Sequence, residues 1–322
     1  MGTSILHAVR CKRESETPHV KAPPYVLLTA AHNEEVHIEG TLQTVLIQNL
    51  LPERWVIVSD NSSDRTDAII REYAKEHDFI EFVRVTRPPG YSFGAKNLAL
   101  REGYKRLQGV EYGFIGVLDA DIWLEPSYFQ ELRRRMEQDT SLGIAAGYVH
   151  EEVEGRYQSR KFNRIDSVAH AGQLMRRECY EAIGGYAILR FGGEDTHATI
   201  SARMKGWQAR SLPDLKIYHQ RHTASVGGEL PGQFRQGQMD YHLGYDALFG
   251  IVKCISRMMH QPFVVGGFVR MCGFAWPYIR RDKREVSQDF VEFVRKEQRK
   301  RMSSFFVSCK NRTTLQHIWK VH

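Results

Sequence analysis

The sequence predicts an α/β fold built on a mostly parallel sheet that helices flank. Three observations favour this class. Short apolar runs alternate with segments of helical periodicity from residue 25 to about residue 140. One of these runs, Tyr112–Leu118, is continuously apolar, which is typical of a strand that is buried on both faces of a mostly parallel sheet. Polar clusters follow the runs directly, as expected where strands end at a binding edge.

The first two strand and helix units are predicted from the first 75 residues or so. Tyr25–Ala31 is an apolar run, followed by His32-Asn33-Glu34-Glu35 and by apolar residues at helical spacing over Ile38–Leu46. Trp55–Ser59 repeats the pattern. It ends in Asp60-Asn61-Ser62-Ser63-Asp64, a turn-rich stretch that can cap a second helix.

Two further units complete the predicted sheet. Ile80–Val85 resembles a strand, Pro88-Pro89-Gly90 breaks the chain, and Ala95–Leu107 has helical periodicity. Tyr112–Leu118 is a fourth apolar run with Asp119 at its carboxyl end. Because the carboxyl ends of parallel strands meet at one edge, we expect the polar clusters that follow the first, second and fourth strands to converge on one crevice.

Asp119-Ala120-Asp121 places two carboxylates two residues apart at the end of the fourth predicted strand. Both can reach one divalent cation, because hard cations prefer oxygen ligands. The pair is a weak motif by itself, since aspartates also form turns without any metal. The apolar flanks Val117-Leu118 and Ile122-Trp123 favour the metal, because carboxylates between them need a cation or several hydrogen-bond donors.

The loop after the first predicted strand contains no glycine. Dinucleotide-binding folds carry G-x-G-x-x-G there and P-loops carry G-x-x-x-x-G-K-[ST], so both classes are disfavoured. A nucleotide diphosphate would then be held by side chains and by a metal, which neutralises charge on a leaving diphosphate. Glu34 and Asp60 can accept hydrogen bonds from a base or ribose, or they can cap the helices that follow them.

A second polar cluster lies later in the chain. Phe191-Gly192-Gly193-Glu194-Asp195 precedes a stretch of helical periodicity, and Asp195 can act there as general base toward an acceptor hydroxyl. The alternative is a glycine turn followed by two acids that the helix macrodipole stabilises. His219 ends the predicted strand Leu215–Tyr218 and is a candidate third metal ligand, although one of 14 histidines can also be incidental.

Taken in chain order, these elements resemble the family 2 glycosyltransferases, which have the GT-A fold. The matching stretches are Ala31-His32-Asn33-Glu34-Glu35 for P-x-Y-N-E-E, Val56–Thr66 for V-D-D-G-S-x-D-x-T, Gly94-Ala95-Lys96-Asn97 for G-x-[KR]-N, Leu118–Asp121 for L-D-A-D, and Ile183–Tyr186 with Gly193-Glu194-Asp195 for the later G-G-F and E-D elements. The resemblance runs from about Tyr25 to His219, and five elements in order are far more specific than any one alone.

The resemblance implies roles for individual residues. Those assigned to the donor nucleotide are Ala30, His32, Glu34, Asp60, Lys96 and Asp119. Asp119 and Asp121 would hold Mn²⁺ or Mg²⁺, and Asp195 would be the catalytic base. From the residues themselves we add His219 as a candidate metal ligand and Gly193 and Glu194 as candidate acceptor-side residues. In the implied mechanism, the acceptor oxygen attacks the anomeric carbon from the face opposite the nucleotide, and the configuration inverts.

The chain departs from the family pattern at two donor-side positions and lacks one signature. Ala30 replaces the usual proline, and His32 replaces the usual tyrosine. Gln233–Gln238 does not match the Q-x-x-R-W signature of processive synthases. We therefore predict a non-processive enzyme of the bacterial surface-glycan or exopolysaccharide type, which transfers one sugar per encounter.

The positive charge of the chain gathers near its C-terminus. The formal net charge is +7, and the segment Ile251–Arg301 carries 12 Lys and Arg against 5 Asp and Glu. Leu243–Tyr278 is apolar but is broken by glycine and proline, and Arg280–Arg284 follows it. This basic helical appendage resembles an interfacial membrane module. It can also be a hydrophobic cap on the catalytic domain, whereas the aromatic spacing disfavours a nucleic-acid partner.

We expect a flexible tail at residues 1–22, a catalytic domain at 23–228, a helical region at 229–302 and a second tail at 303–322. The donor half of the catalytic domain is predicted at about 23–121 and the acceptor half at about 122–228. There is no signal-peptide pattern, no run near the ~18 apolar residues of a spanning helix, and no C-x-x-C pair among the five cysteines. These features predict a cytoplasmic protein that is peripheral on the inner face of the cell membrane.

The leading hypothesis is a metal-dependent, inverting glycosyltransferase that uses a nucleotide-diphosphate sugar and a glycan or polyprenyl-linked acceptor. One alternative is a sugar-nucleotide nucleotidyltransferase, which generally carries a glycine-rich basic loop after the first strand that this chain lacks. The other is a non-catalytic scaffold of the same fold that binds glycan or lipid. The intact Asp119, Asp121 and Asp195 disfavour the scaffold.

Overall fold

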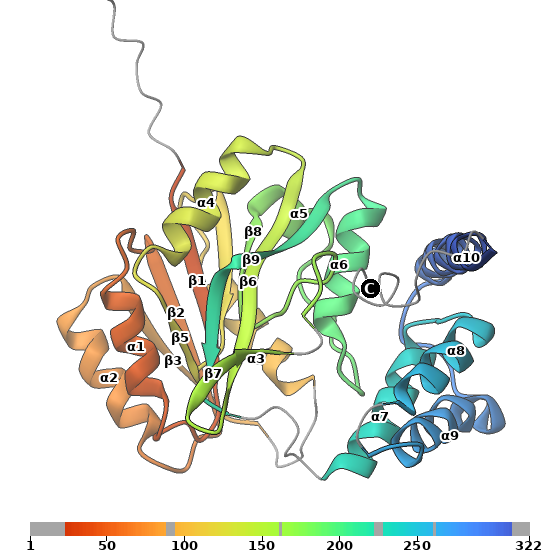
Figure 1. Ribbon diagram of the computed structural model, residues 1–322. Helices are drawn as coiled ribbons and strands as arrows, with labels where there is room; N and C mark the ends of the chain where they lie inside the picture. Colours follow the sequence, from red (N-terminus) through yellow and green to blue (C-terminus); the bar gives the residue numbers. More distant parts are fainter. Residues whose placement is uncertain (1–22, 88–93, 161–162, 222–227, 260–261, 311–322) are drawn as a thin grey trace, which may run out of the picture.

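The computed structural model describes residues 23–87, 94–160, 163–221, 228–259 and 262–310. The predicted tail at 1–22 and residues 311–322 lie outside the described part of the chain. Figure 1 shows a curled sheet with helices packed around it, and a separate group of helices beside it.

The N-terminal half of the sheet is parallel and has the strand order β3-β2-β1-β4. Its elements are β1 (Tyr25–Ala31), α1 (Ile38–Leu46), β2 (Arg54–Asp60), α2 (Thr66–Glu76), β3 (Ile80–Val85), α3 (Ala95–Lys105) and β4 (Phe114–Leu118). The predicted alternation of strands and helices, and with it the α/β fold class, is confirmed.

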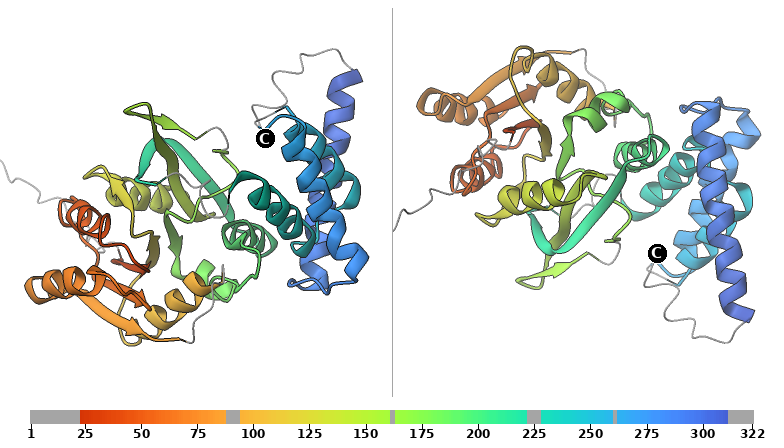
Figure 2. Two further views of the ribbon diagram at one scale, coloured as in Figure 1. Left: turned by 90° about the horizontal axis from the view of Figure 1, so that it is seen from below. Right: turned by 90° about the horizontal axis from the view of Figure 1, so that it is seen from above.

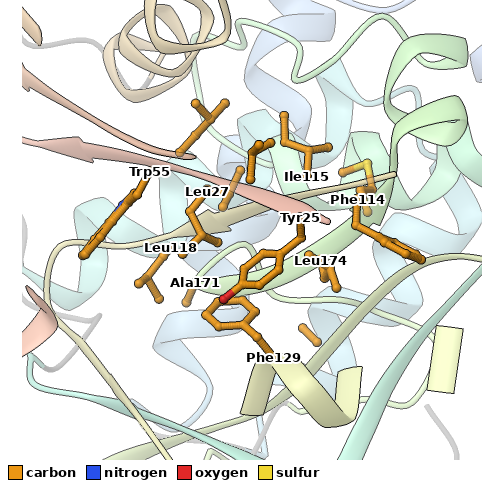
Figure 3. Close-up of a cluster of buried hydrophobic side chains, with 14 of the residues drawn as sticks. Tyr25, Leu27, Trp55, Phe114, Ile115, Leu118, Phe129, Ala171 and Leu174 are labelled. Atoms are coloured by element: carbon orange, nitrogen blue, oxygen red, sulfur yellow. The ribbon is translucent and has the colours of Figure 1, made fainter. Parts of the chain in front are cut away.

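The core lies on both faces of the inner strands β2, β1 and β4, which explains why these are almost wholly apolar, whereas the edge strand β3 also carries Glu81 and Arg84. Figure 3 shows Tyr25 of β1 against Phe129, with ring centroids 5.1 Å apart, while the Tyr25 hydroxyl donates to the carbonyl oxygen of Leu50 at 2.7 Å. Trp55 of β2 is fully buried, and its indole N–H donates to the Thr29 hydroxyl at 2.9 Å. The polar ends of these large side chains are therefore satisfied inside the core.

The sheet continues beyond β4 in the order β8-β6-β9-β5, with β7 paired to β6. The remaining elements of this domain are β5 (Ile122–Leu124), α4 (Tyr128–Gln138), β6 (Leu142–Val153), β7 (Arg156–Ser159), β8 (Gly172–Arg176), α5 (Arg177–Ala182), α6 (Glu194–Met204) and β9 (Gln208–His219). The strand predicted at Leu215–Tyr218 is thus longer, because it continues across Pro213 where the register with β6 shifts.

Four helices follow the sheet: α7 (Glu229–His242), α8 (Ala247–Arg257), α9 (Val265–Arg280) and α10 (Gln288–Lys310). Figure 2 shows them grouped at one side of the sheet domain. The boundary predicted at residue 302 falls inside α10, which continues to Lys310. Among the described residues, no helix is both long enough and apolar enough to cross a bilayer.

Helices α7 and α9 cross without room for side chains at the crossing. A Cβ on Gly237 of α7 would lie 2.1 Å from the carbonyl oxygen of Arg270, and one on Gly273 of α9 would lie 2.0 Å from that of Phe234. Both contacts are with backbone atoms, which cannot move aside as a flexible side chain can. Glycine is therefore required at both positions for the helices to pack this closely.

A second, smaller core connects the helical group to the sheet domain. Leu189 and Ile200 from the sheet domain pack with Leu243, and with Phe290 and Val294 of α10. All five side chains are buried. The helical group is consequently fixed against α6 and the loop that precedes it.

Candidate donor and metal site

The loops that follow β1 and β2 are tied together by hydrogen bonds. The backbone N–H of Asn33 donates to the Ser62 hydroxyl at 3.2 Å, and that of Glu34 donates to the Thr66 hydroxyl at 2.7 Å. In return, the side-chain oxygen of Asn33 accepts from the N–H of Ser63 at 2.8 Å. Asn33 has φ of 54°, in the left-handed region that asparagine tolerates. This geometry fixes the position of Glu34 at the carboxyl edge of the sheet.

Three donor-side candidates lie at the ends of β1 and β2. Ala30 pairs with Val58 in the parallel register. His32 is exposed, and its Nδ1 donates to the backbone carbonyl of Asp60 at 2.5 Å. The Asp60 carboxylate is 13% exposed and accepts from Arg87, whose Nε lies 3.0 Å from Oδ1. Any ligand that Asp60 binds must therefore share this carboxylate with Arg87.

Two threonines of helix α1 hold the backbone of the Asp119–Asp121 segment and of β5 by hydrogen bonds. The Thr41 hydroxyl donates to the carbonyl oxygen of Ala120 at 2.8 Å and accepts from the N–H of Ile122 at 3.2 Å. One turn later, the Thr44 hydroxyl donates to the Leu124 carbonyl at 2.9 Å and accepts from its N–H at 2.8 Å. The two threonines act as backbone partners for β5 and hold both aspartates in place.

Asp119 forms an ion pair with Lys96 from the first turn of α3. The Lys96 ammonium lies 2.6 Å from Asp119 Oδ1, and their side chains are 29% and 22% exposed. Burial alone would raise the pKa of Asp119, but the Lys96 ammonium, with a smaller effect of His170, holds it well below its usual range. Asp119 is consequently a carboxylate at any physiological pH. Lys96 also lies within electrostatic range of Glu194, which helps to raise its pKa.

Asp121 belongs to a second charged cluster, which the antiparallel pairing of β5 with β9 assembles. Ile122 pairs with His219, and this register brings His219 Nε2 to 3.4 Å from Asp121 Oδ2. The Nε of Arg221 donates to the same Asp121 oxygen at 2.9 Å, and its Nη2 contacts Glu34 Oε1. Arg221 thus bridges the loop after β1 and the segment after β4.

Glu34 lies in this cluster as a buried acid. Its side chain is 10% exposed, and its second carboxylate oxygen has no hydrogen-bond partner within the described structure. Burial raises the pKa of Glu34 to about 7, although the charge of Arg221 opposes the increase. A buried acceptor without a donor is suited to a ligand that supplies an N–H or O–H group.

Asp195 lies in the first turn of α6, as the helical periodicity indicated. Gly193 precedes this helix with φ of 91°, and a Cβ there would lie 2.9 Å from Sδ of Met239 in α7. The N–H of Thr196 donates to Asp195 Oδ1 at 2.6 Å. Burial raises the pKa of Asp195, and the neighbouring Glu194 carboxylate raises it further. A carboxylate with a raised pKa is better matched to accepting a proton near neutral pH.

His170 is a site residue that the sequence did not single out. It lies just before β8, its Nδ1 is 3.8 Å from Asp119 Oδ1, and its ring packs edge-on against Tyr186 at 4.3 Å. The side chain is 6% exposed, and neither ring nitrogen has a hydrogen-bond partner within the described residues. It also lies within electrostatic range of Asp195. His170 therefore lies between the two predicted halves of the site.

Arg221 was also absent from the predicted site, because it follows a β strand without any surrounding motif. Its role becomes visible only through the pairing of β9 with β5. No sequence signal identified His170 either, since its contact with Asp119 depends on the antiparallel pairing of β8 with β4.

The residues around Asp121 fit a divalent cation in their chemistry. Carboxylate oxygen and imidazole nitrogen are accepted ligands of Mn²⁺. Asp121 offers a carboxylate oxygen and His219 an imidazole nitrogen, and these two atoms lie 3.4 Å apart. The same oxygen already binds the cationic Arg221. Asp119, the third predicted ligand, is instead paired with Lys96. Within the described ranges, no group of three His, Cys, Asp or Glu side chains is arranged to hold a metal, so phosphate oxygens of a bound donor would have to complete the coordination.

Comparison with protein families identifies one match. Residues 27–196 match the model of glycosyl transferase family 2, which covers more than half of the chain. This range contains β1 to β8 and the first turn of α6. It therefore includes every predicted site residue except His219.

Two curated relatives and one solved structure illustrate the similarity. The probable glycosyltransferase YdaM of Bacillus subtilis is 29% identical over 219 residues, which are 62% of this chain and 51% of the relative. The poly-β-1,6-N-acetyl-D-glucosamine synthase of Staphylococcus epidermidis is 30% identical over 132 residues, which are 41% of this chain and 30% of the relative. The chain thus spans about half or less of the length of these relatives.

The structural comparison extends over nearly the whole chain. The mannosyltransferase PcManGT of Pyrobaculum calidifontis, solved with GDP-Man and Mn²⁺, aligns with 92% of this chain and 78% of its own, at a TM-score of 0.51 and 14% sequence identity. At this level of identity the likeness concerns the fold alone.

Proposed function

This chain belongs to glycosyl transferase family 2, as its motifs indicated, and we propose that it transfers a single sugar from a nucleotide-diphosphate donor to an acceptor hydroxyl with inversion of configuration. The donor nucleotide binds at the carboxyl ends of β1, β2 and β4, and the acceptor approaches from the side of α6. One sugar is transferred per encounter.

The observation that carries this proposal is that the half-buried Asp195 and the Asp119–Lys96 pair are both close to His170. His170 lies 3.8 Å from Asp119 and within electrostatic range of Asp195, so the two carboxylates flank one small region. Asp119 is held ionised, whereas burial raises the pKa of Asp195. Two acids whose environments shift their pKa values in opposite directions are typical of a divided catalytic role.

In the mechanism, Asp195 accepts the proton of the acceptor hydroxyl while that oxygen attacks the anomeric carbon. General-base assistance of this kind contributes roughly 10²–10⁴-fold to a rate. Lys96 holds the Asp119 carboxylate in place and contributes positive charge beside the donor. Glu34 accepts a hydrogen bond from the base or ribose through its unpartnered oxygen.

Mn²⁺ or Mg²⁺ would be held by Asp121 and His219, with Asp119 beside them, and would supply charge neutralisation on the leaving diphosphate. Arg221, which contacts Asp121 and Glu34, adds a fixed positive charge at the same place. The protein therefore contributes two cationic side chains of its own to a site that must receive a polyanion.

The proposed acceptor is a glycan in bacterial surface-polysaccharide assembly, linked to a polyprenyl or related lipid. The similarity to a poly-β-1,6-N-acetyl-D-glucosamine synthase supports a role in polysaccharide assembly. In this proposal the protein works on the cytoplasmic face of the cell membrane as a peripheral protein. A lipid-linked acceptor would be presented at that surface.

A thermal-shift panel tests the donor site. UDP-, GDP- and dTDP-sugars are added with and without Mn²⁺, because a ligand that binds only the folded state raises the melting temperature. We expect one nucleotide class to stabilise the protein in an Mn²⁺-dependent manner. The Asp121→Ala variant should lose the Mn²⁺-dependent part of this shift.

Catalysis is tested separately with the donor that binds best. Wild-type protein should release the nucleoside diphosphate slowly by hydrolysis and faster with an acceptor, whereas Asp195→Asn should bind the donor without turning it over. If no nucleotide sugar shifts the wild type, or if Asp121→Ala keeps the full shift, the proposed donor site is wrong. If donor binds but neither hydrolysis nor transfer occurs, the protein is a binding scaffold.

A further inference from the structure

Helices α8 and α9 expose an unusual amount of apolar surface. More than half of the exposed large hydrophobic side chains in the described residues lie between Leu248 and Ile279. Such a concentration marks an interaction surface, since single exposed apolar residues are ordinary but a cluster is not.

On α8 the exposed apolar residues form one stripe. Leu248, Ile251, Val252 and Ile255 follow the spacing of three, four and seven residues that places side chains on a single helix face, and Met259 lies just beyond the end of the helix. Their exposed fractions range from 38% for Val252 to 64% for Met259.

On α9 the same pattern recurs. Val265, Phe268, Trp276 and Ile279 share one face, and they are between 44% and 72% exposed. The turn between the helices adds Phe263, which is 61% exposed. We name the two stripes and this turn the α8–α9 surface.

A buried cluster of charged side chains joins three helices of this group. Asp240 of α7 is 1% exposed and accepts from Lys253 of α8 at 2.9 Å and from Arg270 of α9 at 2.7 Å. The neighbouring Gln236 accepts from Arg270 at 2.6 Å. These buried charged contacts join the three helices, while their outer faces present the apolar side chains described above.

Basic residues lie at the end of the α9 stripe. Arg280, Arg281 and Lys283 directly follow Ile279 and are exposed. Trp276 and Tyr278 precede them, and both are more than 40% exposed. An apolar face bordered by aromatic rings and by Lys and Arg side chains matches the layers of a bilayer surface, where acyl chains, the interface and anionic headgroups follow in order.

We propose that the α8–α9 surface inserts into the headgroup and upper acyl region of a bilayer that contains anionic phospholipid. The apolar stripes enter the acyl boundary, and Arg280, Arg281 and Lys283 contact lipid phosphates. This deepens the proposed function, because it names the surface that would bring the site to a lipid-linked acceptor. The buried Asp240 network keeps α8 and α9 in one orientation while their outer faces are in lipid.

Vesicle flotation of the full chain tests the apolar part. The double variant Ile255→Glu with Phe268→Glu places one charge on each stripe at positions that are 55% and 54% exposed. Binding to vesicles of phosphatidylcholine and phosphatidylglycerol should fall by at least about tenfold. Ile47→Glu, at an equally exposed site of 59% on α1, is the matched control and should bind like wild type.

The basic part is tested with Arg280→Gln, Arg281→Gln and Lys283→Gln combined. Each lost charge should weaken binding to anionic vesicles by roughly fivefold and leave binding to pure phosphatidylcholine almost unchanged. If the Ile255→Glu, Phe268→Glu variant floats with anionic vesicles as well as wild type does, the surface is not the lipid-binding face and the proposal is overturned.

A second copy of the chain is the competing occupant, and light scattering after gel filtration distinguishes it. A wild-type dimer that the double variant converts to a monomer, together with no vesicle binding by either, would also overturn the proposal. Hydrolysis of the nucleotide sugar in solution should be equal in wild type and both multiple variants. If a multiple variant no longer binds vesicles but still hydrolyses the nucleotide sugar, the substitutions have disrupted this surface and not the donor site. If the wild type hydrolyses the donor but does not bind vesicles, the lipid-binding proposal is wrong while the donor site stands.

Discussion

Replacing Arg221 by alanine should destabilise the metal-free protein by about 2 kcal/mol when Glu34 is ionised. Burial raises the pKa of Glu34 to about 7, so this loss is expected at a pH above that value. The guanidinium contacts Asp121 and Glu34, whose side chains are 8% and 10% exposed, while its own is 47% exposed. Removing one partner of a buried pair costs roughly 3–5 kcal/mol, and an exposed pair is worth roughly 0–1 kcal/mol. Because Arg221 is half exposed, the free energy lost in Arg221→Ala should lie between these limits.

Mn²⁺ should restore part of the lost stability. The substitution leaves two buried carboxylates without their counter-charge, and a divalent cation beside Asp121 and His219 would replace it. We therefore expect Mn²⁺ to raise the melting temperature more in Arg221→Ala than in wild type. Full recovery of the ~2 kcal/mol would correspond to roughly 3 °C in a chain of this length, so a partial recovery is smaller.

Urea unfolding with and without Mn²⁺ measures both effects. The control is Arg135→Ala, which removes an ion pair with Asp214 whose side chains are 32% and 55% exposed. This variant should lose less than about 1 kcal/mol and should respond to Mn²⁺ like wild type. Equal losses in the two variants, or an Mn²⁺ response in Arg221→Ala no larger than that of wild type, would refute the reasoning.

Four further variants test other parts of the structure. Asp195→Asn should lower kcat by roughly 10²–10⁴-fold and leave donor affinity unchanged in calorimetry. His170→Ala should weaken nucleotide-sugar binding by about fivefold but not that of the free nucleotide, because its ring nitrogens have no hydrogen-bond partner among the described residues. Gly273→Ala should destabilise the protein by about 3 kcal/mol or more in urea unfolding, because its Cβ would meet a backbone oxygen. For Glu34, the folded pKa of about 7 exceeds the unfolded value of 4.5, so the folded state binds the extra proton. The stability of metal-free wild type relative to Glu34→Gln should therefore fall, by up to about 3 kcal/mol, as the pH rises between these two values.

The sequence was sufficient to predict the parallel half of the fold and the edge at which the site lies. Continuous apolar strands and the polar residues that end them are local features, so Glu34, Asp60 and Asp119 could be assigned to one edge from their positions alone. The roles of these residues remain predictions. Their placement follows directly from the order of strands and helices.

The partners of these residues were not predictable, because each comes from a distant strand. Arg221 reaches Glu34 and Asp121 only because β9 runs antiparallel to β5, and His170 reaches Asp119 only because β8 runs antiparallel to β4. No periodicity encodes such pairing between remote strands. The same limit hid the full length of β9, where Pro213 interrupts the apolar pattern although pairing with β6 resumes beyond it.

The small core formed by Leu189, Ile200, Leu243, Phe290 and Val294 limits how the chain can be shortened. Three of these side chains come from the helical group, and Gly193 in front of Asp195 packs against Met239 of the same group. Truncation after β9 would expose this apolar patch to water and remove the support of the first turn of α6. Expression trials that seek a minimal active fragment should therefore end beyond Val294, since shorter chains would aggregate or leave Asp195 in a poorly supported helix turn.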